Sequence, residues 1–166
     1  YIARTKNVQV TNTATECIAA LDADVRPYKS QHDPNFVLEA SLDGGGLKRN
    51  GEVVGVSGEV NNKAHVSLYV WSPNEHGDRI HRIFPNQYDE ENQMIGKFNI
   101  PTTGKRKQYR FYADFPETQK GNAANEWLFL LATKSKFETL AHESSENFYK
   151  RLDELGRKSW RLKKIG

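Results

Sequence analysis

Short runs in which apolar and polar residues alternate recur along this chain, and they constrain its fold more than any other feature. The clearest run is 64–71, where Ala64, Val66, Leu68 and Val70 alternate with polar or aromatic residues. Successive side chains on a strand point to opposite faces of a sheet, so this alternation predicts a strand with one buried face. Further strands are predicted at 36–42, 52–60, 79–84, 97–100, 109–115, 126–133 and 160–165.

Turn-forming residues separate these runs. Glycines at 44–46 end one run, the pair Asn61-Asn62 is predicted to be a hairpin turn, and 73–78 forms the next turn. Gly55 and Gly58 indicate a bulge or a close approach of backbone. About seven to eight short strands joined by such turns are typical of a mainly β protein, and we expect an antiparallel β-sandwich, immunoglobulin-like or similar.

A helix is expected near each end of the chain. Residues 13–16 (Thr-Ala-Thr-Glu) match a capping box and are followed by apolar residues at helical spacing, which predicts a helix over 13–25. Near the other end, apolar residues again recur at helical spacing. This second helix is expected to begin at a serine cap, Ser144 or Ser145, and to stop at Gly156.

The composition suits one domain with a modest core. Of the 166 residues, 37% are hydrophobic and 27% are charged. We expect a single domain over 1–166, with the sandwich at 36–133 and a helix and basic tail at 144–166. The longest apolar run, 127–132, is far short of the roughly 20 residues that a membrane-spanning helix needs. Because the chain begins at Tyr1 without a hydrophobic signal segment, we expect it to be a piece of a longer protein.

Basic residues concentrate at the C-terminal end. Residues 150–166 hold seven Lys or Arg side chains and two acidic ones, within a chain of formal charge +3. Such a run is usually a solvated face, and the alternative is that it binds an anionic ligand or membrane headgroups. A basic turn at 105–107 beside aromatic residues would suit nucleic acid, but a charged hairpin tip explains it more simply. The net charge is small, and we expect no nucleic acid partner.

One stretch of the chain resembles a known family. It contains 66–71 (Val-Ser-Leu-Tyr-Val-Trp), 82–86 (Arg-Ile-Phe-Pro-Asn), Asn92, 112–116 (Tyr-Ala-Asp-Phe-Pro) and 126–133 (Glu-Trp-Leu-Phe-Leu-Leu-Ala-Thr), in this order. Over about residues 51–137, this pattern is similar to the bacterial domain of unknown function 4384 family. The resemblance implies an accessory domain of a bacterial envelope protein, or an appendage on a multidomain protein. It supplies no catalytic residue.

The most specific element of that pattern, the triplet Phe84-Pro85-Asn86, has an architectural interpretation. Phe84 can anchor the strand end in the core, and Pro85 ends strand pairing because it lacks an N–H group. Asn86 can close the following turn by bonding to nearby backbone. We therefore expect the triplet to act on the fold rather than on a ligand.

Aromatic and cationic residues gather around the triplet and form a candidate binding site. Mixtures of such groups line binding pockets, so this region is a candidate for a protein partner or for a small anionic or glycan ligand. The alternative is a solvated strand face and loop. The candidate binding residues are Tyr69, Trp71, Arg79, His81, Arg82, Asn86 and Asn92.

No residue pattern predicts a metal centre or a catalytic site. His76, Asp78 and His81 supply suitable donors, but they match no helix-borne zinc spacing. The acidic cluster at 89–92 lacks the alternation and the glycine of a calcium-binding loop. Neither a Gly-x-Ser-x-Gly motif nor a phosphate-binding glycine loop occurs. We expect no cofactor and no enzyme activity.

Three functional hypotheses follow. The favoured one is a non-catalytic protein-interaction or structural accessory module of a bacterial cell-envelope protein or of a secretion or surface assembly. Its location would be the periplasm or cell envelope, with the cytoplasm as the alternative. The second hypothesis is a β-sandwich that binds a small anionic or glycan ligand near Tyr69, Trp71, Arg79 and His81. The third, a hydrolase or metal enzyme, needs a set of convergent residues that the sequence does not supply.

Overall fold

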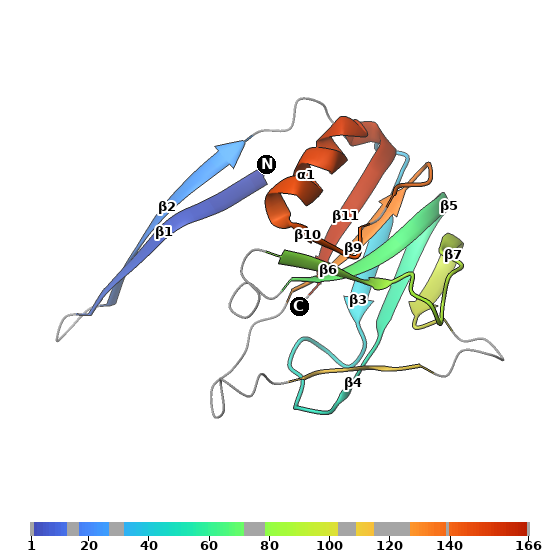
Figure 1. Cartoon of the computed structure of the whole chain (residues 1–166), viewed down its shortest axis with the longest axis horizontal. Helices are drawn as coiled ribbons and strands as arrows, with labels where there is room; N and C mark the ends of the chain where they lie inside the picture. Colours follow the sequence, from blue (N-terminus) through green and yellow to red (C-terminus); the bar gives the residue numbers. More distant parts are fainter. Residues whose placement is uncertain are drawn as a thin grey trace. The chain divides into compact units, whose positions relative to one another are not determined.

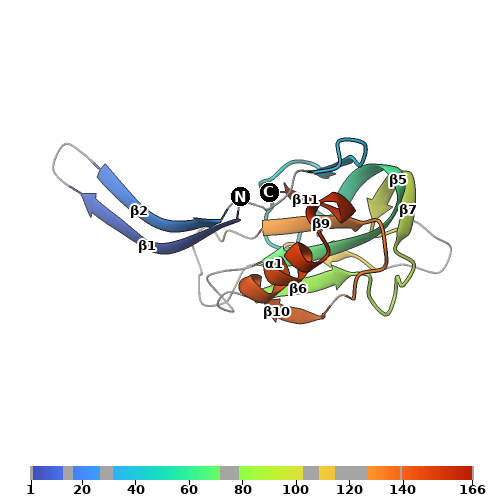
Figure 2. The ribbon, with the colours of Figure 1, turned by 90° about the horizontal axis from the view of Figure 1, so that it is seen from above.

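The computed structural model describes residues 2–12, 17–26, 32–71, 79–102, 109–114, 127–138 and 140–165. The chain divides into two compact units, Tyr1–Gln31 and His32–Gly166, where the sequence had predicted one domain. Figures 1 and 2 show both units, and each is described by itself below.

The first unit is a two-stranded antiparallel ribbon made of β1 (Ile2–Asn12) and β2 (Cys17–Arg26). A register shift between Thr5 and Asn7 interrupts their pairing. The predicted helix over 13–25 is therefore wrong where the chain is described, and the capping-box residues 13–16 lie outside the described residues. Apolar residues at 17, 19, 21, 23 and 25 also fit a period of two, and pairing with β1 supplies the backbone bonds that a helix would have made internally.

The second unit is organised around one long strand, β5 (Val56–Trp71), in a seven-stranded antiparallel sheet. The first half of β5 pairs with β3 (Leu38–Leu42) and β7 (Gln93–Ile100). Its second half pairs with β6 (Arg79–Phe84) and β9 (Trp127–Thr133). Beyond these lie β10 (His142–Ser144) on β6 and β11 (Trp160–Ile165) on β9. A separate small sheet joins β4 (Val53–Val54) to β8 (Phe111–Tyr112).

The expectation of a mainly β, antiparallel protein is confirmed. The strands predicted at 79–84 and 160–165 have the predicted bounds, and β9 is buried on both faces between β5 and β11. The run at 109–115 is a strand only at Phe111–Tyr112 among its described residues. The described strands of the second unit form one large sheet and one small one, and the immunoglobulin-like sandwich stays a prediction.

The predicted hairpin turn at Asn61-Asn62 is wrong, because β5 runs through both residues without turning. The two asparagine side chains bond instead to the segment that leads into β3. Asn61 Oδ1 accepts from the backbone N–H of Val37 at 2.8 Å, and both side-chain amides donate to the carbonyl of Asn35. The pairing of β5 with β7 shifts register between Val60 and Ala64. The two asparagines therefore lie at a β-bulge inside a strand and not at a hairpin turn.

Two sets of buried side chains lie on the two faces of this sheet. The inner face, which carries Val56, Val60, Val66 and Leu68 of β5, encloses the main hydrophobic core. On the opposite, outer face, α1 (Ser145–Glu154) covers the second half of β5, where the Phe148 ring meets the Tyr69 ring edge-on with centroids 4.9 Å apart. Figures 1 and 2 show α1 against this part of the sheet.

The helix near the C-terminus has the predicted start and stop signals. Ser144 is the N-cap, and its hydroxyl accepts from the backbone N–H of Asn147 at 3.2 Å. Gly156 follows the helix with a φ of +76°, a conformation that glycine adopts without strain. The short 3-10 turn η2 (Arg157–Ser159) then leads into β11.

Candidate functional site

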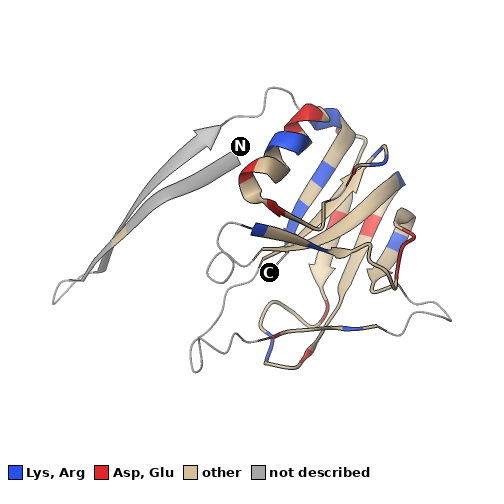
Figure 3. Ribbon diagram, viewed as in Figure 1, with Lys and Arg blue, Asp and Glu red and all other residues tan. Residues whose placement is uncertain are grey.

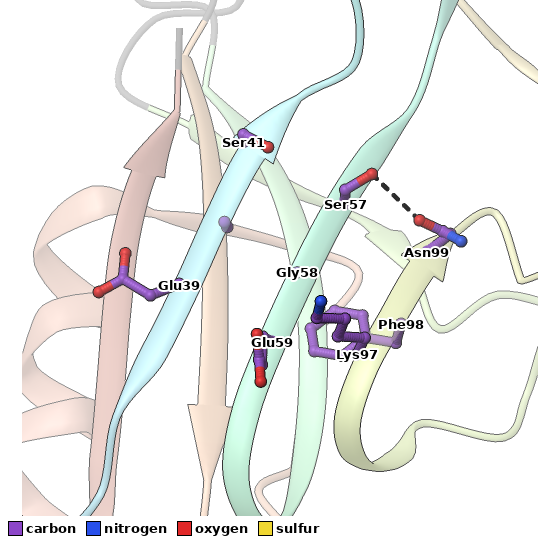
Figure 4. A pocket seen from close by; sticks show the side chains of 9 residues that line it. Glu39, Ser41, Ser57, Gly58, Glu59, Lys97, Phe98 and Asn99 are labelled. Carbon is purple, nitrogen blue, oxygen red and sulfur yellow. Dashed lines mark hydrogen bonds between the residues drawn. The ribbon is translucent and has the colours of Figure 1, made fainter.

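The outer face of the sheet is exposed beside the first half of β5, and a groove crosses it there (Figure 4). The groove has a volume of about 570 Å³ and is open rather than enclosed. Its lining comes from three neighbouring strands, β3, β5 and β7, rather than from a loop. The lining residues are Glu39, Ala40, Ser41, Ser57, Gly58, Glu59, Lys97, Phe98 and Asn99.

Strand register arranges the polar side chains of the groove in two rows. In one row, Ser57 lies opposite Ser41 on one side and Asn99 on the other. In the second row, Glu59 lies opposite Glu39 and Lys97. Side chains directly opposite on antiparallel strands interact, so each row is one physical unit.

The serine row is organised by hydrogen bonds. The Ser57 hydroxyl lies 2.6 Å from Asp43 Oδ1 and 3.0 Å from the side-chain amide of Asn99, and Figure 4 shows the latter contact. A hydroxyl has one proton, so at any moment Ser57 donates either to the carboxylate of Asp43 or to the side-chain oxygen of Asn99. The row therefore brings amide, hydroxyl and carboxylate groups together in one chain.

The charged row places two carboxylates opposite each other, an arrangement that is unfavourable without a compensating cation. Lys163 of β11 supplies one, since its Nζ lies 2.9 Å from Glu39 Oε2. Lys97 faces Glu59 across the strands from the other side. The row is thus a carboxylate pair flanked by two lysines, and it suits partners that carry both positive and negative groups.

Gly58 lies between the two rows, and the ring of Phe98 occupies the place that a side chain at Gly58 would need. Phe98 is half-buried and packs against the core from the inner face. The sequence predicted a bulge or a close backbone approach at the glycines of this run, whereas the close neighbour of Gly58 is the side chain of Phe98. Because Gly58 has no side chain, the Phe98 ring packs directly against the backbone of β5 on the core side. The same backbone forms the floor of the groove on the other side.

The outer edge of β7 borders the groove. Within the described part of the chain, β7 pairs with β5 alone. Ile95, on this strand, is 69% exposed, which is high for a large apolar side chain in a strand. The edge therefore combines available backbone groups with an apolar side chain.

The aromatic residues of the sequence-predicted site lie elsewhere. Tyr69 is completely buried under α1, and Trp71 packs near Phe129 with ring centroids 6.0 Å apart. Burial raises the pKa of the Tyr69 phenol, and the nearby Glu143 carboxylate raises it further. In this position the Tyr69 ring packs against α1 and is not exposed at the surface.

The predicted cationic residues lie along β6. Arg79 is exposed at the start of the strand, and the backbone N–H of Arg82 donates to the carbonyl of Ala141. His81 lies opposite His142 of β10, with their Nδ1 atoms 2.6 Å apart. Because one ring nitrogen must donate and the other accept at this distance, the two imidazoles form a hydrogen bond. This pair fastens the short edge strand β10 to β6.

The predicted motif residues shape the turn after β6. Phe84 is fully buried in the core, and Pro85 follows it directly. The Asn86 side chain donates to the carbonyl of Ile83 and accepts from the backbone N–H groups of Tyr88 and Asp89. These contacts have the geometry of a turn closed by an asparagine, as the architectural interpretation requires.

The same turn contains a buried carboxylate that sequence reasoning treated as part of an acidic loop. Asp89 Oδ2 accepts from the backbone N–H and the hydroxyl of Thr102, at 3.0 and 2.6 Å, and from the phenol of Tyr109 at 3.2 Å. Burial, and then the negative charge of Asp89, raise the pKa of Tyr109. Asp89 thus ties the turn to two later segments of the chain.

Of the predicted binding residues, Tyr69 and Arg82 lie opposite each other on β5 and β6. Asn92 lies directly before β7, where its side chain contacts His65 at 3.3 Å and its carbonyl accepts from the backbone N–H of Val66. None of the predicted residues lines the groove. The groove residues could have been found as the polar halves of the alternating runs 36–42, 52–60 and 97–100, but the pairing that aligns them is not readable from one sequence.

No cofactor or metal site follows from this geometry. Among the residues that the structure describes, no group of three or more His, Cys, Asp or Glu side chains is placed to hold a metal ion. His76 and Asp78 lie outside the described residues. Within the described residues, no helix has the length and apolar character needed to cross a membrane.

Comparisons of the chain with protein-family models, with curated proteins and with solved structures found no match.

Proposed function

We propose that this chain is a non-catalytic protein-interaction module and that its partner binds as an extended segment along the edge of β7. One observation carries the proposal. β7 is an eight-residue strand that pairs with β5 alone in the described part of the chain. The N–H and C=O groups on its outer side are a template for another strand, and many recognition domains bind peptides by adding one.

Side chains at this edge support a selective interaction. Ile95 is an exposed apolar anchor, while Lys97 and the nearby register shift are features that discourage indiscriminate strand pairing. An added strand would extend both polar rows of the groove, so its side chains would meet Lys97 in one row and Asn99 in the other. The backbone would supply affinity and these rows would supply specificity.

The biological setting is proposed from the family resemblance. An accessory module of a bacterial cell-envelope protein, or of a secretion or surface assembly, would work in the periplasm or cell envelope, and the cytoplasm is the alternative. We retain the β-sandwich as the proposed fold, and we propose no enzyme activity and no cofactor. The open groove, which is lined by polar and charged side chains, supports a binding role.

The first experiment places a photoreactive amino acid at position 95 of the protein in its native cells. A matched control carries it at position 47, where Leu47 is 96% exposed in a loop outside the sheet. The proposal predicts one protein that crosslinks from position 95 and not from position 47. The crosslinked segment of that partner is then made as a peptide, and its affinity for the wild-type protein is measured.

Substitutions on β7 test whether its edge binds the partner peptide. Ile95→Lys should weaken peptide binding by about tenfold or more, because it removes the apolar anchor from the centre of the contact. Leu47→Lys should bind like the wild type. Equal affinities for Ile95→Lys and wild type, with both proteins folded, would overturn the proposed site.

A second candidate function is binding of a small polar ligand such as a glycan. The observation that favours it is the chain of amide, hydroxyl and carboxylate groups in the groove, since such groups recognise sugar hydroxyls. This places the ligand on Ser57 and Asn99 rather than on the Tyr69 region. A glycan array probed with wild type and Asn99→Ala would test it, and signals that Asn99→Ala leaves unchanged would exclude this site.

A further inference from the structure

The outermost strand of the groove carries a lysine that forms no ion pair within the described part of the chain. Lys97 is exposed and lies directly opposite Glu59 in the pairing of β5 with β7, but the two side chains do not form an ion pair. At the other end of the same row, Lys163 pairs with Glu39 at 2.9 Å. Figure 3 shows acidic residues on β3 and β5 between basic residues on β11 and β7. The ammonium group of Lys97 is therefore available to a carboxylate beyond the edge.

Asn99, two residues further along β7, also offers hydrogen-bond donors. Its side-chain oxygen lies 3.0 Å from the Ser57 hydroxyl, and Figure 4 shows its amide nitrogen on the side away from Ser57. That nitrogen carries two N–H groups. Among the residues that the structure describes, none accepts a hydrogen bond from them. Lys97 and Asn99 thus both present donors to a strand that pairs with β7.

These two residues lie in the regular half of β7. Residues 97–100 pair with β5 without interruption, whereas Gly96, with a φ of +70°, and the register shift of β5 separate them from the first half. Alternate residues of a strand share a face, and Lys97 and Asn99 both line the groove. Phe98, between them, packs against the core. The strand therefore holds the two donor residues side by side on its outer face.

A strand added to β7 would continue both rows of the groove. Its side chains opposite Lys97 and Asn99 would be two residues apart, because residues on one face of a strand recur with a period of two. Opposite charges at directly opposite positions attract, and like charges repel. A carboxylate therefore suits the position opposite Lys97, and a side chain with an acceptor oxygen suits the position opposite Asn99.

The carboxylate of Glu59 weakens this preference without cancelling it. Neighbouring strands are about 4.8 Å apart, so a residue on the added strand would lie about twice as far from β5 as from β7. The Coulomb energy falls with distance, and salt screens it further when the separation approaches the Debye length of about 8–10 Å. The attraction to Lys97 therefore exceeds the repulsion from Glu59, whereas a lysine opposite Lys97 would be repelled.

We propose that the partner segment at the β7 edge is an acidic extended peptide, with a carboxylate opposite Lys97 and a second acceptor side chain two residues away, opposite Asn99. Ile95, on the other side of Gly96, supplies the apolar contact at one end of this motif. The inference rests on the proposed function, since it concerns the same edge. It adds the chemistry of the partner, which excludes basic segments.

A library of random eight-residue peptides displayed on phage, selected on the wild-type protein, tests this chemistry. The proposal predicts that the enriched peptides share an Asp or Glu with another Asp, Glu, Asn, Ser or Thr two positions away. Each enriched peptide is then synthesised, and hydrogen exchange shows whether it protects the amides of β7.

The outcomes separate the inference from the proposed function. Peptides that protect β7 but are not enriched in acidic residues would overturn the inference and leave the proposed function standing. A library without binders, or binders that leave β7 unprotected, would overturn the proposed edge site and the inference with it. Acidic peptides that protect β7 support both.

Charge reversal tests Lys97 directly. Each acidic residue of a selected peptide is replaced in turn by lysine, and the affinities are measured by calorimetry. At one of these positions the wild type should prefer the acidic form by about fivefold or more, because the paired charges change from opposite to like. Lys97→Gln should remove most of this preference, and Lys97→Glu should reverse it. Lys97→Gln keeps the test decisive if a third carboxylate in the row unfolds Lys97→Glu.

A control with the same change of net charge shows whether position matters. Lys158→Glu alters an exposed residue of η2 that does not line the groove, and it should retain the wild-type preference. An equal loss of preference in Lys158→Glu and Lys97→Glu would reduce the effect to net charge and overturn the inference. Asn99→Asp, which replaces donors with acceptors, should weaken the selected peptides by about threefold or more. Unchanged affinity for Asn99→Asp would overturn the second position of the motif.

Discussion

At the scale of single residues, Gly58 and Phe98 show how closely the groove and the core are coupled. Any side chain at Gly58 would enter the space of the Phe98 ring. Gly58→Ala should therefore lower the free energy of unfolding by about 1–3 kcal/mol, because the ring must move out of its packed position. Urea denaturation of the purified variant measures this change.

A double-mutant cycle supplies the control for Gly58→Ala. In a Phe98→Leu background the obstructing ring is absent, so the added methyl group should cost clearly less than in the wild type. Glu59→Ala, at an exposed neighbouring position, should change stability little. An equal cost of Gly58→Ala in both backgrounds would show that Phe98 does not determine the requirement for glycine.

Phe84 tests the architectural interpretation of the Phe-Pro-Asn triplet. Its side chain has 0% exposure in the main core, so Phe84→Ala should destabilise the protein by about 3–5 kcal/mol through lost burial and the cavity left behind. Leu47→Ala, which shortens an exposed apolar side chain, is the control and should have little effect. An unchanged melting temperature for Phe84→Ala would refute the interpretation.

Two tyrosines give the protein a predictable response to high pH. Burial raises the pKa of Tyr69 and of Tyr109 above the ordinary value of about 10. The folded state therefore favours the neutral phenols. Their contribution to stability is fully present below pH about 10 and is lost as the pH rises through the higher folded values.

An ultraviolet absorbance titration checks this response. Of the seven tyrosines in the chain, at least two should ionise in a late phase. Tyr69→Phe and Tyr109→Phe should each remove one phenol from that phase. Above pH 10, stability should fall less steeply in Tyr69→Phe than in the wild type. A late phase that neither substitution reduces would contradict the assignment.

At the scale of elements, α1 depends on its first residue as well as on its buried face. Ser144 both ends β10 and accepts a hydrogen bond from the N–H of Asn147. Ser144→Ala should cost about 0.5–2 kcal/mol, and Ser144→Asp should retain most of the stability, because aspartate also caps helices. Thermal unfolding followed by circular dichroism compares the three proteins. If Ser144→Asp loses as much as Ser144→Ala, the capping role is wrong.

Elements whose local pattern agreed with their tertiary surroundings were predictable from the sequence. The alternation in 64–71 and 79–84 and the serine cap before α1 each correspond to observed structure. The segment 17–25 was not predictable, because its apolar residues fit both a helical period and a period of two, and pairing with β1 decided between them. Asn61 and Asn62 have turn chemistry, but their side chains bond to 35–37 across the sheet.

The candidate site could be predicted only in part. The alternating runs identify which residues of 36–42, 52–60 and 97–100 are polar, but not which of them are neighbours. Which polar residues are neighbours depends on the register of strand pairing. It also depends on β5 continuing through Asn61, because β3 and β7 then pair with the same half of β5. Tyr69 was predicted to be available to a ligand because its strand face was assumed to be open, whereas α1, about 80 residues later, covers it.

At the scale of the whole molecule, the second unit has one covered and one open region on the outer face of its sheet. Helix α1 covers the part around Tyr69, whereas the part between β3 and β7 carries the groove and ends at the β7 edge. Strand β5 belongs to both parts and to the main core. We therefore expect the α1 side to contribute stability, and we propose that the β7 side binds the partner.

Hydrogen exchange with and without the captured partner peptide tests this central claim most directly. If the peptide adds a strand, amides of Gln93–Ile100 that face away from β5 should exchange more slowly by about tenfold or more, because they become hydrogen-bonded. Amides of α1 should keep their exchange rates. Protection that is absent from β7 and appears on α1 or β10 would contradict the account.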